Sequence, residues 1–129
     1  MAPATSLLSL IATALLAAQS VAALGCFGSG ETYGQVTSDT SQLASARSSA
    51  CNSFAGSYPQ GASRSLCASF PDTGTRINFS ASNTASTPQT LTYDDCEAAL
   101  TIEMNGCKRG SRQKHGNFEY LDDPNNGTC

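Results

Sequence analysis

The stretch CKRGSRQKHGNFEYLDDPNNGTC, from Cys107 to Cys129, decides how the rest of the chain is interpreted. It begins and ends on a cysteine and contains a basic turn, a short aromatic strand and an acidic turn with Pro and Gly. Free termini fray, so a cysteine at the last residue indicates an end anchored by a disulfide, formed in an oxidising compartment. We therefore expect a small disulfide-stapled domain that displays this segment on its surface.

The N-terminal end of the chain has the pattern of a secretory signal peptide. The apolar run Leu7–Ala18 is too short to span a bilayer, and small residues ending at Ala23 match the cleavage rule for such signals. A membrane anchor is the alternative, but neither a second apolar run nor a flanking charge supports it. We expect residues 1–23 to be a signal peptide, residues 24–129 to form one domain, and the protein to be secreted and extracellular, without stable membrane insertion.

Cysteine content predicts covalent cross-links. An even number of cysteines in a short secreted chain indicates three disulfides, and the fifteen pairings that six cysteines allow all remain open. The chain has one histidine and no CxxC pair, which disfavours a zinc site, so we expect neither a metal nor a cofactor. Asn78 and Asn126 begin N-glycosylation sequons. The cysteines are Cys26, Cys51, Cys67, Cys96, Cys107 and Cys129.

The spacing of apolar residues predicts both helices and strands. Cys51 falls on the buried face of the first helix and is expected to tie that helix to a sheet. The strands are polar on one face, which favours an antiparallel over a parallel sheet. The sequence thus predicts an α+β fold: a small two-layer α/β sandwich with an antiparallel sheet of about four strands and two helices on one face. The expected elements are an irregular strand at 26–36, helices at 37–54 and 92–105, and strands at 64–70, 76–83 and 117–121.

Two groups that resemble catalytic pairs have simpler structural explanations. Thr92 is placed to cap a helix, and Asp94 and Asp95 then stabilise the positive end of its dipole. His115 lies in a Gly-flanked basic turn beside Lys114, and a neighbouring cation makes a poor base of it. No serine-nucleophile motif or unpaired cysteine accompanies this histidine. We therefore expect no enzymatic activity.

The sequence also argues against nucleic-acid binding and calcium binding. Basic residues cluster at 108–114, but the formal net charge of the chain is −3 and acidic residues flank the cluster. These charges are expected to solvate a turn, and nucleic acid is not expected as a partner. The stretch 122–127 (DDPNNG) has calcium-type ligands without the spacing of an EF-hand, and we interpret it as a turn stabilised by Asx hydrogen bonds.

Aromatic and polar residues are the remaining candidates for molecular recognition. Sugar binding needs ring faces for the apolar side of a pyranose, and amides, carboxylates or guanidinium groups for its hydroxyls. A domain of this size also buries most of its few aromatic residues, so some of these rings are expected in the core. The candidate glycan-binding residues are Tyr33, Tyr58, Arg112, Asn117, Phe118, Tyr120 and Asp122.

Several short motifs carry a resemblance to a known family. They are Gly25–Phe27, Ala50–Cys51, 64–67 (RSLC), 76–80 (RINFS), 95–96, 105–107 and, most distinctively, 116–120 (GNFEY) and 123–129 (DPNNGTC). Through these motifs the mature chain resembles the small, secreted, cysteine-rich fungal glycan-binding proteins of the "Y-three" lectin family. The resemblance implies a compact α/β sandwich with disulfides that binds glycans and has no catalytic activity.

The leading functional prediction is a secreted, non-catalytic, lectin-like protein that binds a glycan or glycoprotein outside the cell. The alternative is a small secreted effector or killer-toxin-like protein that acts on a membrane protein of a host or competitor. A lectin is expected to bind a defined oligosaccharide, whereas an effector is expected to bind none and to inhibit growth or trigger host-cell death. We expect a monomer or a weak homodimer.

Overall fold

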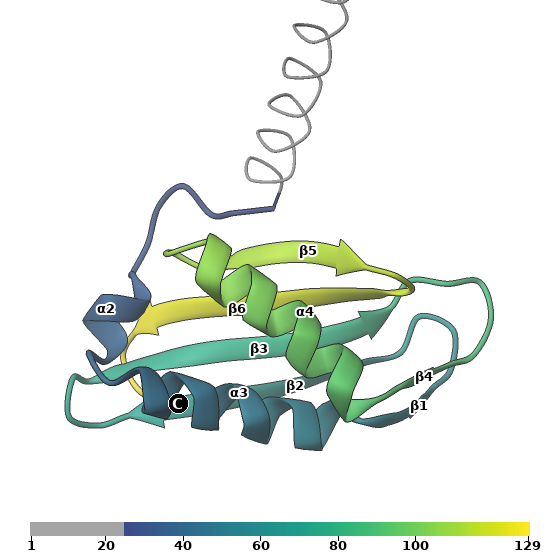
Figure 1. Cartoon of the computed structure of the whole chain (residues 1–129), viewed down its shortest axis with the longest axis horizontal. Helices are drawn as coiled ribbons and strands as arrows, with labels where there is room; N and C mark the ends of the chain where they lie inside the picture. The colour runs from purple at the N-terminus through teal and green to yellow at the C-terminus, as the bar shows by residue number, and fades with distance from the viewer. Residues whose placement is uncertain (1–24) are drawn as a thin grey trace, which may run out of the picture.

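The chain folds into two layers, with helices packed on one face of an antiparallel sheet (Figure 1). The computed structural model describes residues 25–129, so the predicted signal peptide at 1–23 lies outside the described residues. The elements are α2 (Tyr33–Val36), α3 (Thr40–Phe54), β1 (Gly56–Tyr58), β2 (Ser63–Phe70), β3 (Thr75–Asn83), β4 (Gln89–Leu91), α4 (Tyr93–Gly106), β5 (Ser111–His115) and β6 (Phe118–Asn126).

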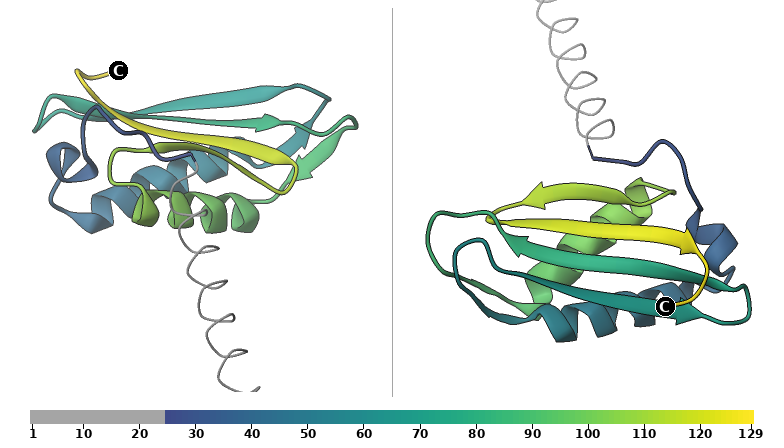
Figure 2. Two further views of the ribbon diagram at one scale, coloured as in Figure 1. Left: turned by 90° about the horizontal axis from the view of Figure 1, so that it is seen from above. Right: turned by 180° about the vertical axis from the view of Figure 1, so that it is seen from behind.

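The main sheet has the strand order β2-β3-β6-β5, and all neighbours are antiparallel. Figure 2 shows α3 and α4 on one face of this sheet, with the other face bare and the C terminus on the bare side. The predicted α+β sandwich of four antiparallel strands with two helices on one face is confirmed. The strands predicted at 64–70 and 76–83 are also confirmed, as β2 and β3, and they form a hairpin in which Phe70 pairs with Thr75.

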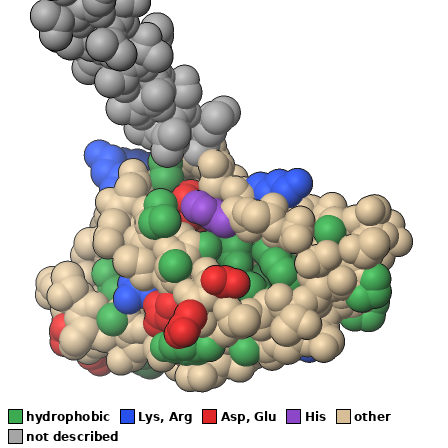
Figure 3. All heavy atoms as spheres, turned by 45° about the vertical axis from the view of Figure 1, so that its right-hand side comes forward, with side chains coloured by type: hydrophobic (Ala, Val, Ile, Leu, Met, Phe, Trp, Pro, Cys, Tyr) green, Lys and Arg blue, Asp and Glu red, His purple; other side chains and the backbone are tan. Residues whose placement is uncertain are grey.

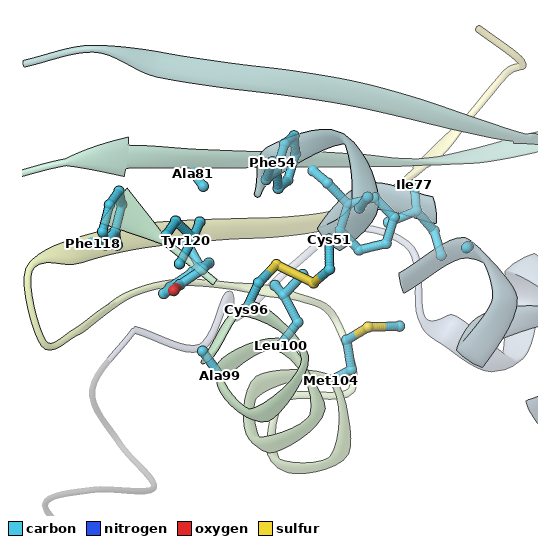
Figure 4. Close-up of a cluster of buried hydrophobic side chains, with 14 of the residues drawn as sticks. Cys51, Phe54, Ile77, Ala81, Cys96, Ala99, Leu100, Met104, Phe118 and Tyr120 are labelled. Carbon is cyan, nitrogen blue, oxygen red and sulfur yellow. A yellow bond between two sulfur atoms is a disulfide. The ribbon is translucent and has the colours of Figure 1, made fainter. Parts of the chain in front are cut away.

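Alternation along the two central strands builds the core. Ile77, Phe79 and Ala81 of β3 are at most 1% exposed, and Phe118 and Tyr120 of β6 lie on the same face. These side chains meet the buried sides of α3 and α4 (Figure 4). The expectation that each strand has one polar face is therefore met in β3 and β6, and the helix layer is placed by burial of these apolar side chains.

Both long helices begin at side-chain caps close to the predicted positions. Asp39 accepts a hydrogen bond from the backbone N–H of Ser41 at 2.9 Å and starts α3. Thr92 accepts one from the N–H of Asp95 at 3.1 Å and starts α4. Such caps satisfy backbone donors that have no partner within the helix. Asp94 and Asp95 lie in the first turn of α4, as predicted from the helix dipole.

The N-terminal segment corrects the predicted irregular strand at 26–36. Only Cys26 makes a strand-like bridge, to Ser111, and the chain then turns into the short helix α2. The reason is a capping box, in which Thr32 accepts from the N–H of Gln35 and the Gln35 side chain accepts from the N–H of Thr32 at 2.7 Å. This local pair outweighs the weak strand propensity of a glycine-rich stretch.

The C-terminal segment contains more strand than predicted. Lys108 and Arg109 lie in a turn, as predicted, but Arg112 and Lys114 lie in strand β5. The stretch interpreted as an Asx turn continues β6 to Asn126. Strand β5 begins at Ser111, which pairs with Asp122, so β5 does not extend as far as Pro124. A proline fits at this position of β6 because no hydrogen bond to β5 is lost there. Gly110 is required beside it, because a Cβ there would lie 2.3 Å from the carbonyl oxygen of Asp122.

A second, two-stranded sheet was not predicted. Strands β1 and β4 pair antiparallel, with Tyr58 opposite Gln89, in segments for which the sequence predicted no element. Asn83 holds the connection, since its side-chain amide donates to the carbonyl oxygens of Tyr58, Pro59 and Thr87. Strands of three residues are too short to give a periodic signal in the sequence.

Three disulfides connect distant parts of the domain, as predicted, and no cysteine is free within the described residues. The bond to Cys129 confirms that the C-terminal residue is anchored, here to β2. The expectation for Cys51 was wrong, because this residue joins α3 to α4 and not to the sheet. The pairs are Cys26–Cys107, Cys51–Cys96 and Cys67–Cys129.

The two disulfides at Cys51 and Cys67 are expected to differ in their contribution to stability. They span separations of 45 and 62 residues, for which loop entropy predicts about 4 kcal/mol each. Cys51 and Cys96 are also fully buried, so Cys51→Ala/Cys96→Ala adds the cost of a cavity, about 1–2 kcal/mol. Urea denaturation of this double variant and of Cys67→Ala/Cys129→Ala measures the difference. Equal losses would contradict it.

Candidate functional site

A cleft of about 470 Å³ lies between α4, β4 and the turn that joins β5 to β6. We call it the α4 cleft. Its floor contains the apolar side chains Leu91, Ala98, Ala99, Ile102 and Phe118, and its polar groups come from Gln89, Thr90, Asp95, His115, Asn117 and Tyr120. Figure 3 shows hydrophobic side chains at the base of this region, between the histidine and acidic side chains. A concave apolar floor with a few polar groups at the rim is the usual composition of a small-molecule site.

His115 is positioned by α4 and does not lie in a turn. It ends β5, and its Nε2 is 2.9 Å from Oε2 of Glu103, which is 6% exposed. The predicted turn location was wrong because the basic stretch is a strand, which turns Lys114 to the opposite face. The carboxylate of Glu103 orients the imidazole at one side of the cleft.

Tyr120 contributes a polar group to an otherwise apolar floor. Its side chain is 2% exposed, and its ring centroid lies 6.0 Å from that of His115 and 6.5 Å from that of Phe118. Burial, followed by the charge of Asp95, raises the pKa of its hydroxyl to about 12. Within residues 25–129 this hydroxyl has no hydrogen-bond partner, and it is not sealed from solvent. It therefore remains a protonated donor that a ligand in the cleft is able to reach.

A pair of side-chain amides forms the far rim of the cleft. The Nδ2 of Asn117 donates to Oε1 of Gln89 at 3.1 Å, which links the β5–β6 turn to β4. The carbonyl oxygen of Asn117 also accepts from the backbone and the hydroxyl of Thr84. The Nε2 of Gln89 in turn donates to the hydroxyl of Thr87 at 3.0 Å, so these bonds fix the polar rim in place.

The α4 cleft brings together three of the seven residues predicted to bind a glycan: Asn117, Phe118 and Tyr120. Tyr58 is 1% exposed and its hydroxyl donates to the carbonyl oxygen of Phe54 at 2.6 Å. Arg112 lies on the bare face of the sheet, where it pairs with Glu119 at 3.0 Å. The four predicted rings, including Tyr33, are at most 6% exposed, so none offers an open face for stacking.

Tyr33 and Asp122 form a separate, fully buried polar network. The hydroxyl of Tyr33 donates to one carboxylate oxygen of Asp122, and the hydroxyl of Ser111 donates to the other at 2.5 Å. Burial raises the pKa of Asp122 to about 7, although both hydrogen bonds act in the opposite direction, and the charges of Glu103 and Asp123 add to the rise. The network holds α2 against β5 and β6, and it has no place for a ligand.

Sequence reasoning missed most of the residues that line the cleft. Asp95 was explained by the helix dipole alone, His115 was placed in a turn, and Ile102 was not considered. Ile102 carries a usable sequence signal, because it is an isoleucine on the otherwise polar side of the predicted helix, and in the structure it is 58% exposed. Gln89 could not be found from sequence, since its position depends on the unpredicted pairing of β1 with β4.

The remaining predicted features fall outside the cleft. Asn78 lies on the bare sheet face, where its Oδ1 accepts from Arg76 and Asn125, and Asn126 ends β6.

Within residues 25–129, no three His, Cys, Asp or Glu side chains are grouped so as to hold a metal ion. None of the described helices combines the length and hydrophobicity needed to cross a bilayer.

Comparisons with known proteins leave the function to be argued from this geometry. No family model matches the chain, and no curated protein matches it. The resemblance to the "Y-three" lectins stays a prediction. The α4 cleft is the part of the described surface where an apolar floor, a carboxylate, an imidazole and amides converge.

Ionisation of Asp122 is expected to make the fold less stable as the pH rises. The pKa of this group is about 7 in the folded chain against 3.8 for an unperturbed carboxyl, so its stabilising contribution is complete below pH 4 and is lost as the pH rises through 7. Between pH 5 and pH 8 the free energy of unfolding should fall by about 3 kcal/mol from this group.

Urea denaturation of the wild type and of Asp122→Asn at several pH values tests this expectation. The amide has no charge to lose, and it is able to accept from one hydroxyl and donate to the other, so the variant should lose the slope. A slope that survives in the variant would assign the effect to another group.

Proposed function

We propose that the protein binds the terminal sugars of a glycan in the α4 cleft, outside the cell and without breaking a bond. The observation that carries the proposal is the composition of the cleft, where apolar side chains form the floor and hydroxyl, amide, carboxylate and imidazole groups lie at its edge. A sugar ring has the complementary pattern, with apolar C–H groups on its faces and hydroxyls around its edge. The volume of the α4 cleft, about 470 Å³, is within the range of small-ligand sites.

Ring stacking is not the main source of affinity in this proposal. Phe118 is 6% exposed, so the exposed side chain of Ile102 supplies most of the apolar contact. Polar contacts must then determine which sugar is bound, through Asp95, Asn117 and the hydroxyl of Tyr120. A carboxylate is able to accept hydrogen bonds from two adjacent sugar hydroxyls, which makes the contact directional. Each hydrogen bond to a charged group contributes about 1.5–3 kcal/mol.

An extracellular location is supported by the three disulfides, because such bonds persist in oxidising compartments. The buried network and the cross-links also supply a rigid support for the cleft, and a rigid support lowers the entropic cost of binding a flexible glycan.

Asp95→Asn is expected to lower glycan affinity about tenfold or more, because it removes a charged acceptor from the cleft. Asp94→Asn is the matched control, since it removes the same charge from the same helical turn but does not line the cleft. A glycan array on the oxidised protein identifies the ligand, and calorimetric titration of both variants with that ligand measures the effect.

Tyr120→Phe gives a second test, because it removes the cleft hydroxyl and keeps the buried ring. Equal affinities for Asp95→Asn and Asp94→Asn, with Tyr120→Phe unchanged, would place the sugar elsewhere. Release of free sugar from the bound oligosaccharide would contradict the absence of catalysis. An array without any binder, with growth inhibition of a target cell, would favour the effector alternative.

A further inference from the structure

A second and larger hollow lies on the other side of the helix layer. This groove, of about 830 Å³, runs between α3 and strand β2. Ser41, Ser45 and Ser49 follow one another at four-residue spacing along the α3 wall. Leu66 and Ala68 of β2 form the apolar side. Short side chains on both walls leave room for the side chains of another polypeptide between them.

Strand β2 borders this groove with an unpaired backbone edge. It is the terminal strand of the sheet and pairs with β3 on one side, and within residues 25–129 no strand pairs with its other side. Its eight residues include neither Pro, Lys nor an acidic residue, and the guanidinium group of Arg64 folds back onto the carbonyl oxygen of Ala55 at 2.9 Å. Proteins usually protect such an edge with charges, prolines or a covering segment.

The opposite edge of the sheet carries the protection that β2 lacks. The chain around Cys26 covers the start of β5, where Arg112 donates its N–H to the carbonyl oxygen of Gly25 at 2.9 Å. Arg112 and Lys114 add exposed charges along the same strand. The β5 edge of the sheet is therefore protected, whereas the β2 edge is available for pairing with another strand.

The charges of the groove determine the kind of partner that fits. Asp39, at the start of α3, and Asp72, in the turn after β2, both line the groove. Hydrogen bonds from Ser41 lower the pKa of Asp39, which keeps this carboxylate ionised. Among the described residues that line the groove there is no Lys, Arg or His. An occupant with a basic side chain at this end would complement both carboxylates.

We propose that the β2 edge and the α3 groove bind an extended, basic segment of a partner protein, which adds to the sheet as a fifth strand. Backbone hydrogen bonds to β2 supply the attachment, alternate side chains enter the groove between Leu66 and the serines of α3, and a Lys or Arg lies near Asp39 and Asp72. An eight-residue edge accommodates a segment about 26 Å long. This site is separate from the α4 cleft and does not depend on glycan binding.

Selection of linear ten-residue peptides from a random library on the full, oxidised protein tests the proposal. The selected peptides should carry Lys or Arg, and in NMR spectra they should shift the backbone amides of 64–70. Because a strand pairs through alternate residues, N-methylation of one alternate set of peptide amides should abolish binding, and methylation of the other set should leave it intact.

The charge contribution has its own matched control. Asp39→Asn/Asp72→Asn should weaken peptide binding about tenfold, and asparagine is still able to cap α3, so the fold is kept. Glu31→Gln/Asp94→Asn removes the same charge away from the groove and should have no effect. The proposal is overturned if no peptide is selected, if both methylated series bind alike, or if the shifts lie on another surface. An oligosaccharide that shifts the same amides where peptides do not would also overturn it.

Discussion

The disulfide between Cys51 and Cys96 is the constraint on which the other features depend. Both residues are fully buried and join the two long helices within the core, where Phe54 and Leu100 pack beside them (Figure 4). The salt bridge between Arg47 and Glu97, at 2.6 Å, adds a second contact between the same helices. A fixed helix pair determines where each helix meets the sheet, and so determines the shape of the α4 cleft and of the groove on the other side.

The inward face of strand β6 is apolar at one end and polar at the other. Phe118 and Tyr120 pack under α4 at the cleft, whereas Asp122, two residues later, is buried in the network with Tyr33 and Ser111. The strand is held on both sides by β3 and β5, and its end is tied down by Cys129. Apolar burial and a costly buried acid therefore coexist on one strand, since full hydrogen bonding offsets part of the desolvation cost of the carboxyl.

The sequence predicted features that depend on neighbouring residues and missed those that depend on distant ones. Periodicity located both long helices, strands β2 and β3, and the first part of β6, because each signal lies within one element. Strands β1 and β4, the partner of Cys51 and the burial of Asp122 follow from contacts between remote segments. The site divides in the same way: Asn117, Phe118 and Tyr120 lie on one strand and its turn, whereas Gln89 and Asp95 reach the cleft only through the tertiary fold.

The position of the two hollows lets each be altered without disturbing the other. The register puts His115, Phe118 and Asn83 at one end of the sheet, beside the cleft, and Phe70 and Thr75 at the other end, beside the groove. Rim residues such as Asn117 are exposed, so substitution there changes the polar groups offered to a ligand at little cost in stability. Tyr120 is different, because its ring belongs to the core and its hydroxyl to the cleft. Recognition at the floor is thus tied to packing, whereas recognition at the rim is not.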